Sequence, residues 1–176
     1  MVFVLFLAAI GLALFWFLPL GFAIAGAVLA EADDPTMQTA VATVVSGIIG
    51  SVTFWGSLVA FDKLQGLMLP DHPVHFPAQQ VGNGMLGVTA LGLGVWVLSD
   101  PSNLAAYGLL VAVASVLGIL LTIPIGGADM PVAIAVLNSY SGLAAASTGF
   151  VLNNDILIIT GSLVGASGLI LTLIMC

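Results

Sequence analysis

Basic residues are almost absent from this sequence, because Lys63 is the only lysine or arginine among 176 residues. A protein that binds nucleic acid neutralises several phosphates with such residues, so this class of function is excluded. Charged residues of both signs make up 5% of the chain, whereas a soluble domain carries about 25%. Since 61% of the residues are hydrophobic, the sequence predicts that lipid surrounds most of the protein surface.

Cysteine is as scarce as basic charge. Cys176 is the single cysteine, which excludes a disulfide framework and a cysteine-based metal site. It is also the last residue, and it follows the apolar run Leu169–Met175. Membrane chains usually leave the bilayer through a polar or basic flank. This ending therefore predicts that the chain is a piece of a longer one.

Catalytic and ligand-binding motifs are also missing. The sequence has no GxGxxG motif and no evident pairing of a nucleophile with a base. His72 and His75 lie close together, but no group of acids or cysteines accompanies them to complete a metal site. We expect a solvated loop there, and we expect neither a metal nor a cofactor to be bound by this chain.

Apolar runs are what the sequence has in abundance. A helix needs about 20 apolar residues to cross a bilayer, and its backbone polar groups must all bond internally. Six runs are long enough, so we predict an all-α, polytopic integral membrane bundle of about six transmembrane helices. The predicted spans are Val2–Ala30, kinked at Pro19, and then Met37–Phe61, Gln79–Leu98, Leu104–Ile125, Pro131–Leu152 and Ile156–Met175.

The segments between the spans predict an orientation. Lys63 falls in the predicted loop Asp62–Pro77, and basic residues favour the cytoplasmic side of the membrane. With six spans, both chain ends and the break at Gly126–Met130 then lie on that side too. Asp155 is placed where we expect the N-cap of the last span.

Small and polar residues recur on one helical face in four of the spans. In the second span their spacing alternates between four and three residues, which places all of them on one face. The pattern leaves open whether the stripes pack helices closely or line a polar path. Their members are Thr39, Thr43, Ser46, Gly50, Thr53 and Ser57; Asn83, Gly87, Ala90 and Gly94; Asn138, Ser141, Ala145 and Thr148; and Gly161, Gly165, Gly168 and Thr172.

Asn138 lies about two helical turns inside the fifth span, which puts its amide at membrane depth. An unbonded amide costs several kcal/mol there. Residues of this kind mark polar paths, and an interhelical hydrogen bond without a transport role fits the position equally well. Asp129 is expected to cap the same helix, with Pro131 in the first turn. Because Asp129 and Asn138 are nine residues apart, they should face opposite sides of an ideal helix.

Two long motifs lie in the last third of the chain. Ile125–Gly142 is IGGADMPVAIAVLNSYSG, and Val151–Gly168 is VLNNDILIITGSLVGASG. Both closely resemble the beta subunit of proton-translocating NAD(P) transhydrogenase, as do the upstream segments Ile49–Phe61 and Lys63–Pro70. The resemblance covers residues 39–176, so the chain divides into a divergent N-terminal span, 1–36, and transhydrogenase-like spans, 37–176.

The resemblance implies a function that the composition does not reveal. Members of this family couple hydride transfer from NADH to NADP⁺ with inward proton movement across a bacterial inner membrane or the mitochondrial inner membrane. NAD(H) and NADP(H) bind in domains outside the membrane, and the complex includes an alpha subunit and is usually a symmetric dimer. This chain is then the membrane part that conducts protons. It would have no nucleotide site of its own, and the NADP(H) domain would follow residue 176.

Two residues match positions that have a role in the family. Asp129 matches an aspartate at the membrane face nearest the NADP(H) domain, and Asn138 matches a mid-membrane asparagine on the proton path. Ser139, Ser141 and the glycines of the last span match residues that surround this path. The predicted proton-path residues are Asn138, Asp129, Ser139, Ser141, Thr39, Thr43, Ser46 and Thr53, and the predicted helix-packing residues are Gly50, Gly161, Gly165 and Gly168.

The sequence departs from the family at one functional position. The family often has a protonatable histidine in the span before the Gly-Ser-Val-Thr-Phe motif, and counting back from Gly50 places it at Thr39, which cannot accept a proton. We therefore expect another chain to supply this histidine, or this chain not to conduct protons alone. The alternative function is a small multi-spanning transporter or scaffold subunit without a redox role, which predicts packed stripes and no water near Asn138.

Overall fold

The structure is a computed structural model that describes residues 36–66, 78–101 and 103–176, and the regular elements within these ranges are all helices. Five of the helices are long and apolar enough to cross a membrane, so the predicted fold class is confirmed. The span predicted at Val2–Ala30 and the loop with both histidines lie outside the described residues. The elements are α2 (Met37–Gln65), α3 (Gln79–Ser99), α4 (Leu104–Thr122), the short 3-10 helix η1 (Gly127–Asp129), α5 (Met130–Val151) and α6 (Asp155–Met175).

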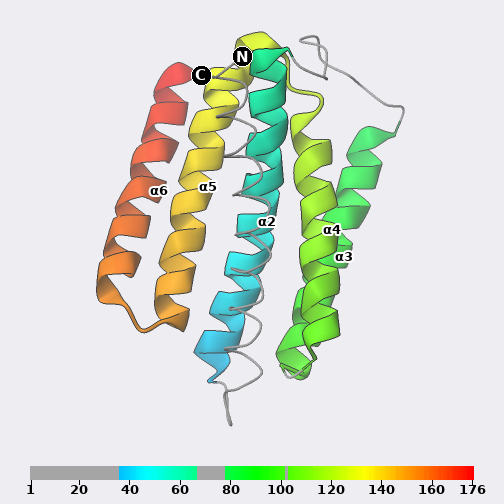
Figure 1. The fold of residues 1–176 in the computed structure, drawn as a ribbon, viewed down its shortest axis with the longest axis vertical. Helices are drawn as coiled ribbons and strands as arrows, with labels where there is room; N and C mark the ends of the chain where they lie inside the picture. Colours follow the sequence, from blue (N-terminus) through cyan, green and yellow to red (C-terminus); the bar gives the residue numbers. More distant parts are fainter. Residues whose placement is uncertain (1–35, 67–77, 102) are drawn as a thin grey trace, which may run out of the picture.

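The helices stand in a row with α2 at its centre (Figure 1). One side of α2 packs against α5, and α5 in turn packs against α6. The other side of α2 packs against α4, and α3 packs against α4. Consecutive helices are antiparallel. The last turns of α2, α4 and α6 therefore meet the first turns of α3 and α5 at one end of the row, which we call the Asp129 end because η1 lies there.

Three helices begin at a polar side chain that bonds to their first turn. Thr36 Oγ1 accepts from the Thr39 amide of α2 at 3.3 Å, and Asn103 Oδ1 accepts from the Ala106 amide of α4 at 3.2 Å. The cap of α6 is Asn154, whose Oδ1 accepts from the Leu157 amide at 3.2 Å. The prediction of Asp155 as this cap is therefore wrong by one residue. Asp155 is the first helical residue, where its negative charge interacts favourably with the positive end of the helix dipole.

The end of α2 differs from the prediction. The helix continues past Phe61 to Gln65 and stops at Gly66, whose positive φ of 61° suits a residue without a side chain. Lys63 is therefore part of the last helical turn and not of a loop. Its side chain is 1% exposed, because it extends into the Asp129 end of the row and does not reach solvent.

The end of α4 also differs, because the helix stops at Thr122 and not at Ile125. Pro124 has no backbone N–H, so it cannot donate to the carbonyl four residues earlier. That carbonyl, on Leu120, accepts instead from the side chain of Gln79 in α3, with Nε2 at 3.1 Å. The chain then turns through Gly126 into η1 and α5.

Small residues determine how closely the helices pack. A Cβ placed on Gly142 of α5 would lie 2.5 Å from the backbone nitrogen of Gly165 in α6. A Cβ on Gly161 would lie 2.5 Å from the nitrogen of Ala146. The two helices therefore touch backbone to backbone, as membrane helices without a hydrophobic driving force often do.

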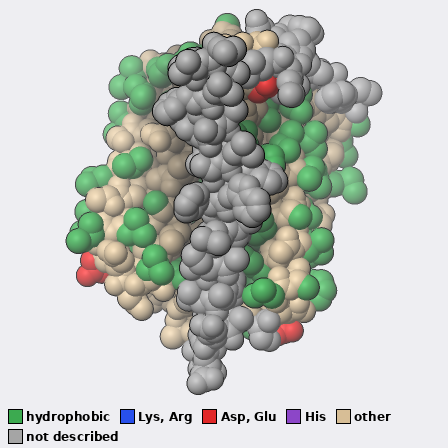
Figure 2. All heavy atoms as spheres, viewed as in Figure 1, with side chains coloured by type: hydrophobic (Ala, Val, Ile, Leu, Met, Phe, Trp, Pro, Cys, Tyr) green, Lys and Arg blue, Asp and Glu red, His purple; other side chains and the backbone are tan. Residues whose placement is uncertain are grey.

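Apolar side chains cover much of the outer surface (Figure 2). Large residues such as Val88 and Leu173 are 72% and 78% exposed. This pattern is the opposite of a soluble protein and agrees with helices that face lipid or other helices of a membrane assembly.

Candidate functional site

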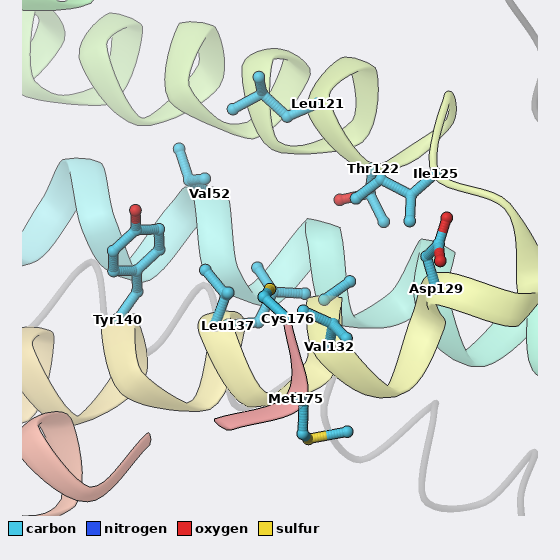
Figure 3. Close-up of a pocket in the computed structure, with 12 residues that line it drawn as sticks. Val52, Leu121, Thr122, Ile125, Asp129, Val132, Leu137, Tyr140, Met175 and Cys176 are labelled. Atoms are coloured by element: carbon cyan, nitrogen blue, oxygen red, sulfur yellow. The ribbon is translucent and has the colours of Figure 1, made fainter. Parts of the chain in front are cut away.

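A cavity of about 570 Å³ is lined by twelve described residues (Figure 3). It lies between α2, α4 and α5, and the last residues of α6 close one side. Asp129 stands at one end and Tyr140 stands farther along α5, with apolar residues such as Leu137 between them. Among the described lining residues, Asp129 alone has a side chain that is charged at neutral pH.

Asp129 occupies the N-cap position of α5, as predicted, but its side chain makes no capping hydrogen bond. The residue is exposed, and its backbone amide donates to the carbonyl of Gly126 at 3.1 Å. Pro131 follows in the first turn, where a missing N–H has no cost. The carboxylate therefore lies beside the cavity and is not used to cap α5.

Asn138 faces away from this cavity. It precedes Tyr140 by two residues, which is a rotation of about 200° on an α-helix, and it does not line the cavity. Asn138 is exposed at the surface of the helix row. Asp129 and Asn138 therefore lie on opposite faces of α5, as their spacing predicts, and the described structure does not bring them together.

The predicted stripe of α2 also faces away from the cavity. Gly50 precedes the cavity residue Val52 by two positions, again a rotation of about 200°. A Cβ on Gly50 would meet no atom within 4 Å, so no described residue makes the close contact predicted there. Three hydroxyls of this stripe donate to carbonyls of their own helix, with Thr43 on Thr39, Ser46 on Thr43, and Thr53 on Ile49 and Gly50. The Thr39 hydroxyl lies at the start of α2 and shares a hydrogen bond of 2.7 Å with the Thr36 hydroxyl.

Ser139 and the glycines of α6 lie between two helices. The Ser139 hydroxyl is buried and donates to the carbonyl of Gly165 at 2.6 Å. A Cβ on Gly168 would lie 2.8 Å from the Ser139 Cβ, so these residues pack α6 on α5. Ser141 instead is exposed on the Asn138 side of α5, and its hydroxyl bonds to the carbonyl of Leu137 at 3.0 Å.

The structure adds residues that the sequence patterns did not single out. Tyr140 and Thr122 contribute hydroxyls to the cavity lining, and Lys63 holds the backbone next to it. Tyr140 follows Asp129 by 11 residues, close to three helical turns, so helical spacing could have grouped them. No sequence pattern indicated the contacts of Lys63, because its partners are about 60 residues away in the sequence.

Comparison with known proteins identifies the family. A family model described as the NAD(P) transhydrogenase beta subunit matches residues 5–176. That range includes most of the N-terminal stretch in which the motifs showed little resemblance. Two curated relatives, both NAD(P) transhydrogenase subunit beta, come from Rhodospirillum rubrum and from one strain of that species. Each is 53% identical over 128 residues, which is 73% of this chain and 27% of the relative.

The chain therefore spans about a quarter of the length of the curated relatives that it matches. The regular elements of the described residues are all helices, and five of these helices are long and apolar enough to span a membrane. The family match over nearly the whole length shows that this chain belongs to the NAD(P) transhydrogenase beta subunit family.

Proposed function

We propose that this chain is the membrane-embedded, proton-conducting part of a proton-translocating NAD(P) transhydrogenase. Protons move through it in step with hydride transfer from NADH to NADP⁺ in partner domains. The chain binds no nucleotide itself, because NADP(H) and NAD(H) occupy domains outside the membrane. Its partners are the NADP-binding domain, the alpha subunit and a second copy of the complex, in a bacterial inner membrane or the mitochondrial inner membrane.

The amide of Asn138 is the observation that supports this proposal most. The residue lies near the middle of α5, is exposed on the row and has no side-chain hydrogen bond to a described residue. At membrane depth an amide needs a polar partner, because lipid offers none. Water or a polar group of another helix would meet that need, and water at this depth would be part of a polar path.

Asp129 has a different role in this proposal. It lies at the Asp129 end of the row, beside a cavity. The residue is exposed, and its carboxylate makes no capping hydrogen bond to α5. A carboxylate in this place can exchange protons between the membrane part and a domain docked against it. Asn138 then relays protons within the membrane, and Asp129 acts as a gate at its surface.

The test is the variant Asn138→Ala in the complete complex, reconstituted in vesicles. With the nucleotides added outside the vesicles, hydride transfer from NADH to NADP⁺ should move protons out of the lumen, toward the nucleotide domains. We expect the rate of this proton movement to fall by about tenfold or more, equivalent to ~1.4 kcal/mol or more in the barrier. The measurement is a pH-sensitive dye signal together with the rate of transhydrogenation in the same vesicles.

Ser147→Ala is the matched control. Ser147 is a polar residue of the same helix, nine positions from Asn138 and so on the other side, and its hydroxyl bonds to the carbonyl of Leu143. We expect this variant to keep the parental rate of proton movement. If Asn138→Ala also kept it, the relay role would be wrong, and a membrane scaffold without proton traffic would fit better.

A further inference from the structure

The connection between α4 and α5, residues 123–129, is held by one buried lysine. Lys63 Nζ, in the last turn of α2, donates to the carbonyl of Ile123 and, at 2.9 Å, to the carbonyl of Ile125. Both carbonyls lie beyond the end of α4, where no further helical turn supplies donors. The cationic side chain is nearly completely buried and lies at the negative end of the α4 dipole.

The same turn of α2 holds the other end of the connection. Ala60, three residues before Lys63 and so on the same helical face, packs in one buried cluster with Met130 and Ala133. Met130 is 0% exposed and follows Asp129 directly. Asp129 therefore lies between two attachments to α2, one through Lys63 at Ile125 and one through Met130 at Ala60.

Within the connection, one short 3-10 turn holds the backbone of Asp129, whose amide donates to the Gly126 carbonyl. The segment contains two consecutive glycines, Gly126 and Gly127, which leave the backbone free to adopt many conformations. The Asp129 side chain makes no capping bond to α5. Apart from this turn, the position of Asp129 beside the cavity depends on the contacts that the flanking residues make with α2.

We propose that Lys63 is a positioning residue that holds the Asp129 carboxylate beside the cavity by binding the Ile123 and Ile125 carbonyls. The role for Asp129 in proton transfer rests on the function proposed above. The position of Asp129 does not, so a measurement of the backbone beside it tests the inference even if no proton transfer occurs.

The experiment uses the complete complex in a Cys176→Ser background. A cysteine at Ala128, which is exposed and adjacent to Asp129, reports the position of the connection through its rate of reaction with a membrane-impermeant maleimide. Lys63→Met keeps an unbranched side chain of similar length and removes the donor and the charge. We expect it to change the labelling rate at least fivefold, whereas Lys63→Arg, which keeps both, stays within twofold of the parent.

Gln79→Leu is the matched control, because it also removes a side-chain donor to a carbonyl at this end of α4. Its target, Leu120, lies inside α4 and not in the connection, so the labelling rate should stay within twofold of the parent. Parental labelling in Lys63→Met, or an equal change in Gln79→Leu, would overturn the proposal.

Failure of assembly is also informative. Lys63→Gln keeps a hydrogen-bond donor on a shorter side chain, and we expect an intermediate labelling rate. If neither Lys63→Met nor Lys63→Gln assembled while Gln79→Leu did, Lys63 would be required for folding, and the positioning role would be rejected. If labelling changed as expected while the parent complex moved no protons, the positioning would stand and the proposed function would fail.

Discussion

Tyr107 lies in the apolar cluster where α2, α3 and α4 meet, and a glycine makes room for it. A Cβ on Gly47 of α2 would lie 2.9 Å from the Tyr107 hydroxyl oxygen and 3.1 Å from its ring. The side chain is 5% exposed, and the hydroxyl has no hydrogen-bond partner among the described residues. A buried polar group without a partner lowers stability by about 1–3 kcal/mol.

Tyr107→Phe should therefore raise stability, because phenylalanine keeps the ring and removes the hydroxyl. We expect a gain of about 1 kcal/mol, seen as a higher midpoint of thermal unfolding of the purified complex in detergent. Tyr107→Leu is the comparison variant and should lower the midpoint, since it leaves a void in the same cluster. A lower midpoint for Tyr107→Phe would mean that the hydroxyl has a partner in the assembled complex.

The glycines at the α5–α6 contact give a second prediction at this scale. Gly142→Ala places a methyl group against the backbone of Gly165, so the two helices must move apart, at a cost of about 1–3 kcal/mol. Gly92→Ala in α3 meets no atom within 4 Å and should leave stability unchanged or slightly higher. The check is a paired thermal-unfolding measurement. Equal losses in both variants would contradict this account of the α5–α6 contact.

At the scale of elements, Pro124 and Gln79 act together at the end of α4. Proline removes the donor for the Leu120 carbonyl, and the glutamine of α3 replaces it. Gln79 thereby ties the start of α3 to the end of α4, two segments separated by 41 residues.

A double-mutant cycle measures this dependence. Gln79→Leu alone should lower the unfolding free energy by about 1 kcal/mol. In a Pro124→Ala background the new amide can donate to Leu120, so Gln79→Leu should cost little, and the coupling between the two sites should be ~1 kcal/mol. The measurement is thermal unfolding of the four proteins. Additive effects would show that proline does not create the need for the glutamine.

The whole molecule has two ends that should face opposite sides of the membrane. Ala128 lies at the Asp129 end, and Asn153 lies in the turn between α5 and α6 at the other end (Figure 1). In inside-out vesicles, an impermeant maleimide should label Ala128→Cys and leave Asn153→Cys unlabelled, in a Cys176→Ser background. Right-side-out vesicles should give the reverse pattern. The opposite outcome would overturn the orientation predicted from Lys63.

Turn residues made most helix boundaries predictable from the sequence. The described α3, α5 and α6 begin and end within one residue of their predicted spans, because Asp, Asn and Pro mark those turns. The ends of α2 and α4 were predicted wrongly, although Gly66 and Pro124 mark them in the sequence. What the sequence could not show is that Lys63 and Gln79 bind carbonyls far along the chain, because local periodicity contains no information about such partners.

The candidate site was predictable only in part. Helical period placed Asp129 and Asn138 on opposite faces of α5, and the described structure agrees. The same period could not distinguish Gly50, with no described neighbour within 4 Å, from Gly161, which touches the backbone of α5. A stripe of small residues shows where side chains are small, but it does not show which helix, if any, packs against them.

The placement of α5 in the row has a consequence for traffic across the membrane. On one side of α5, Met130 and Ala133 pack against Ala60 of α2, and on the other side its backbone touches α6. Asp129 and Asn138 lie on opposite faces of this helix. A proton path that served both residues would have to pass from one face of α5 to the other, and we expect it to pass at the Asp129 end, beside the connection 123–129. Because Lys63 and the Ala60–Met130 contact hold this connection, a movement of the last turn of α2 would change the backbone along that path.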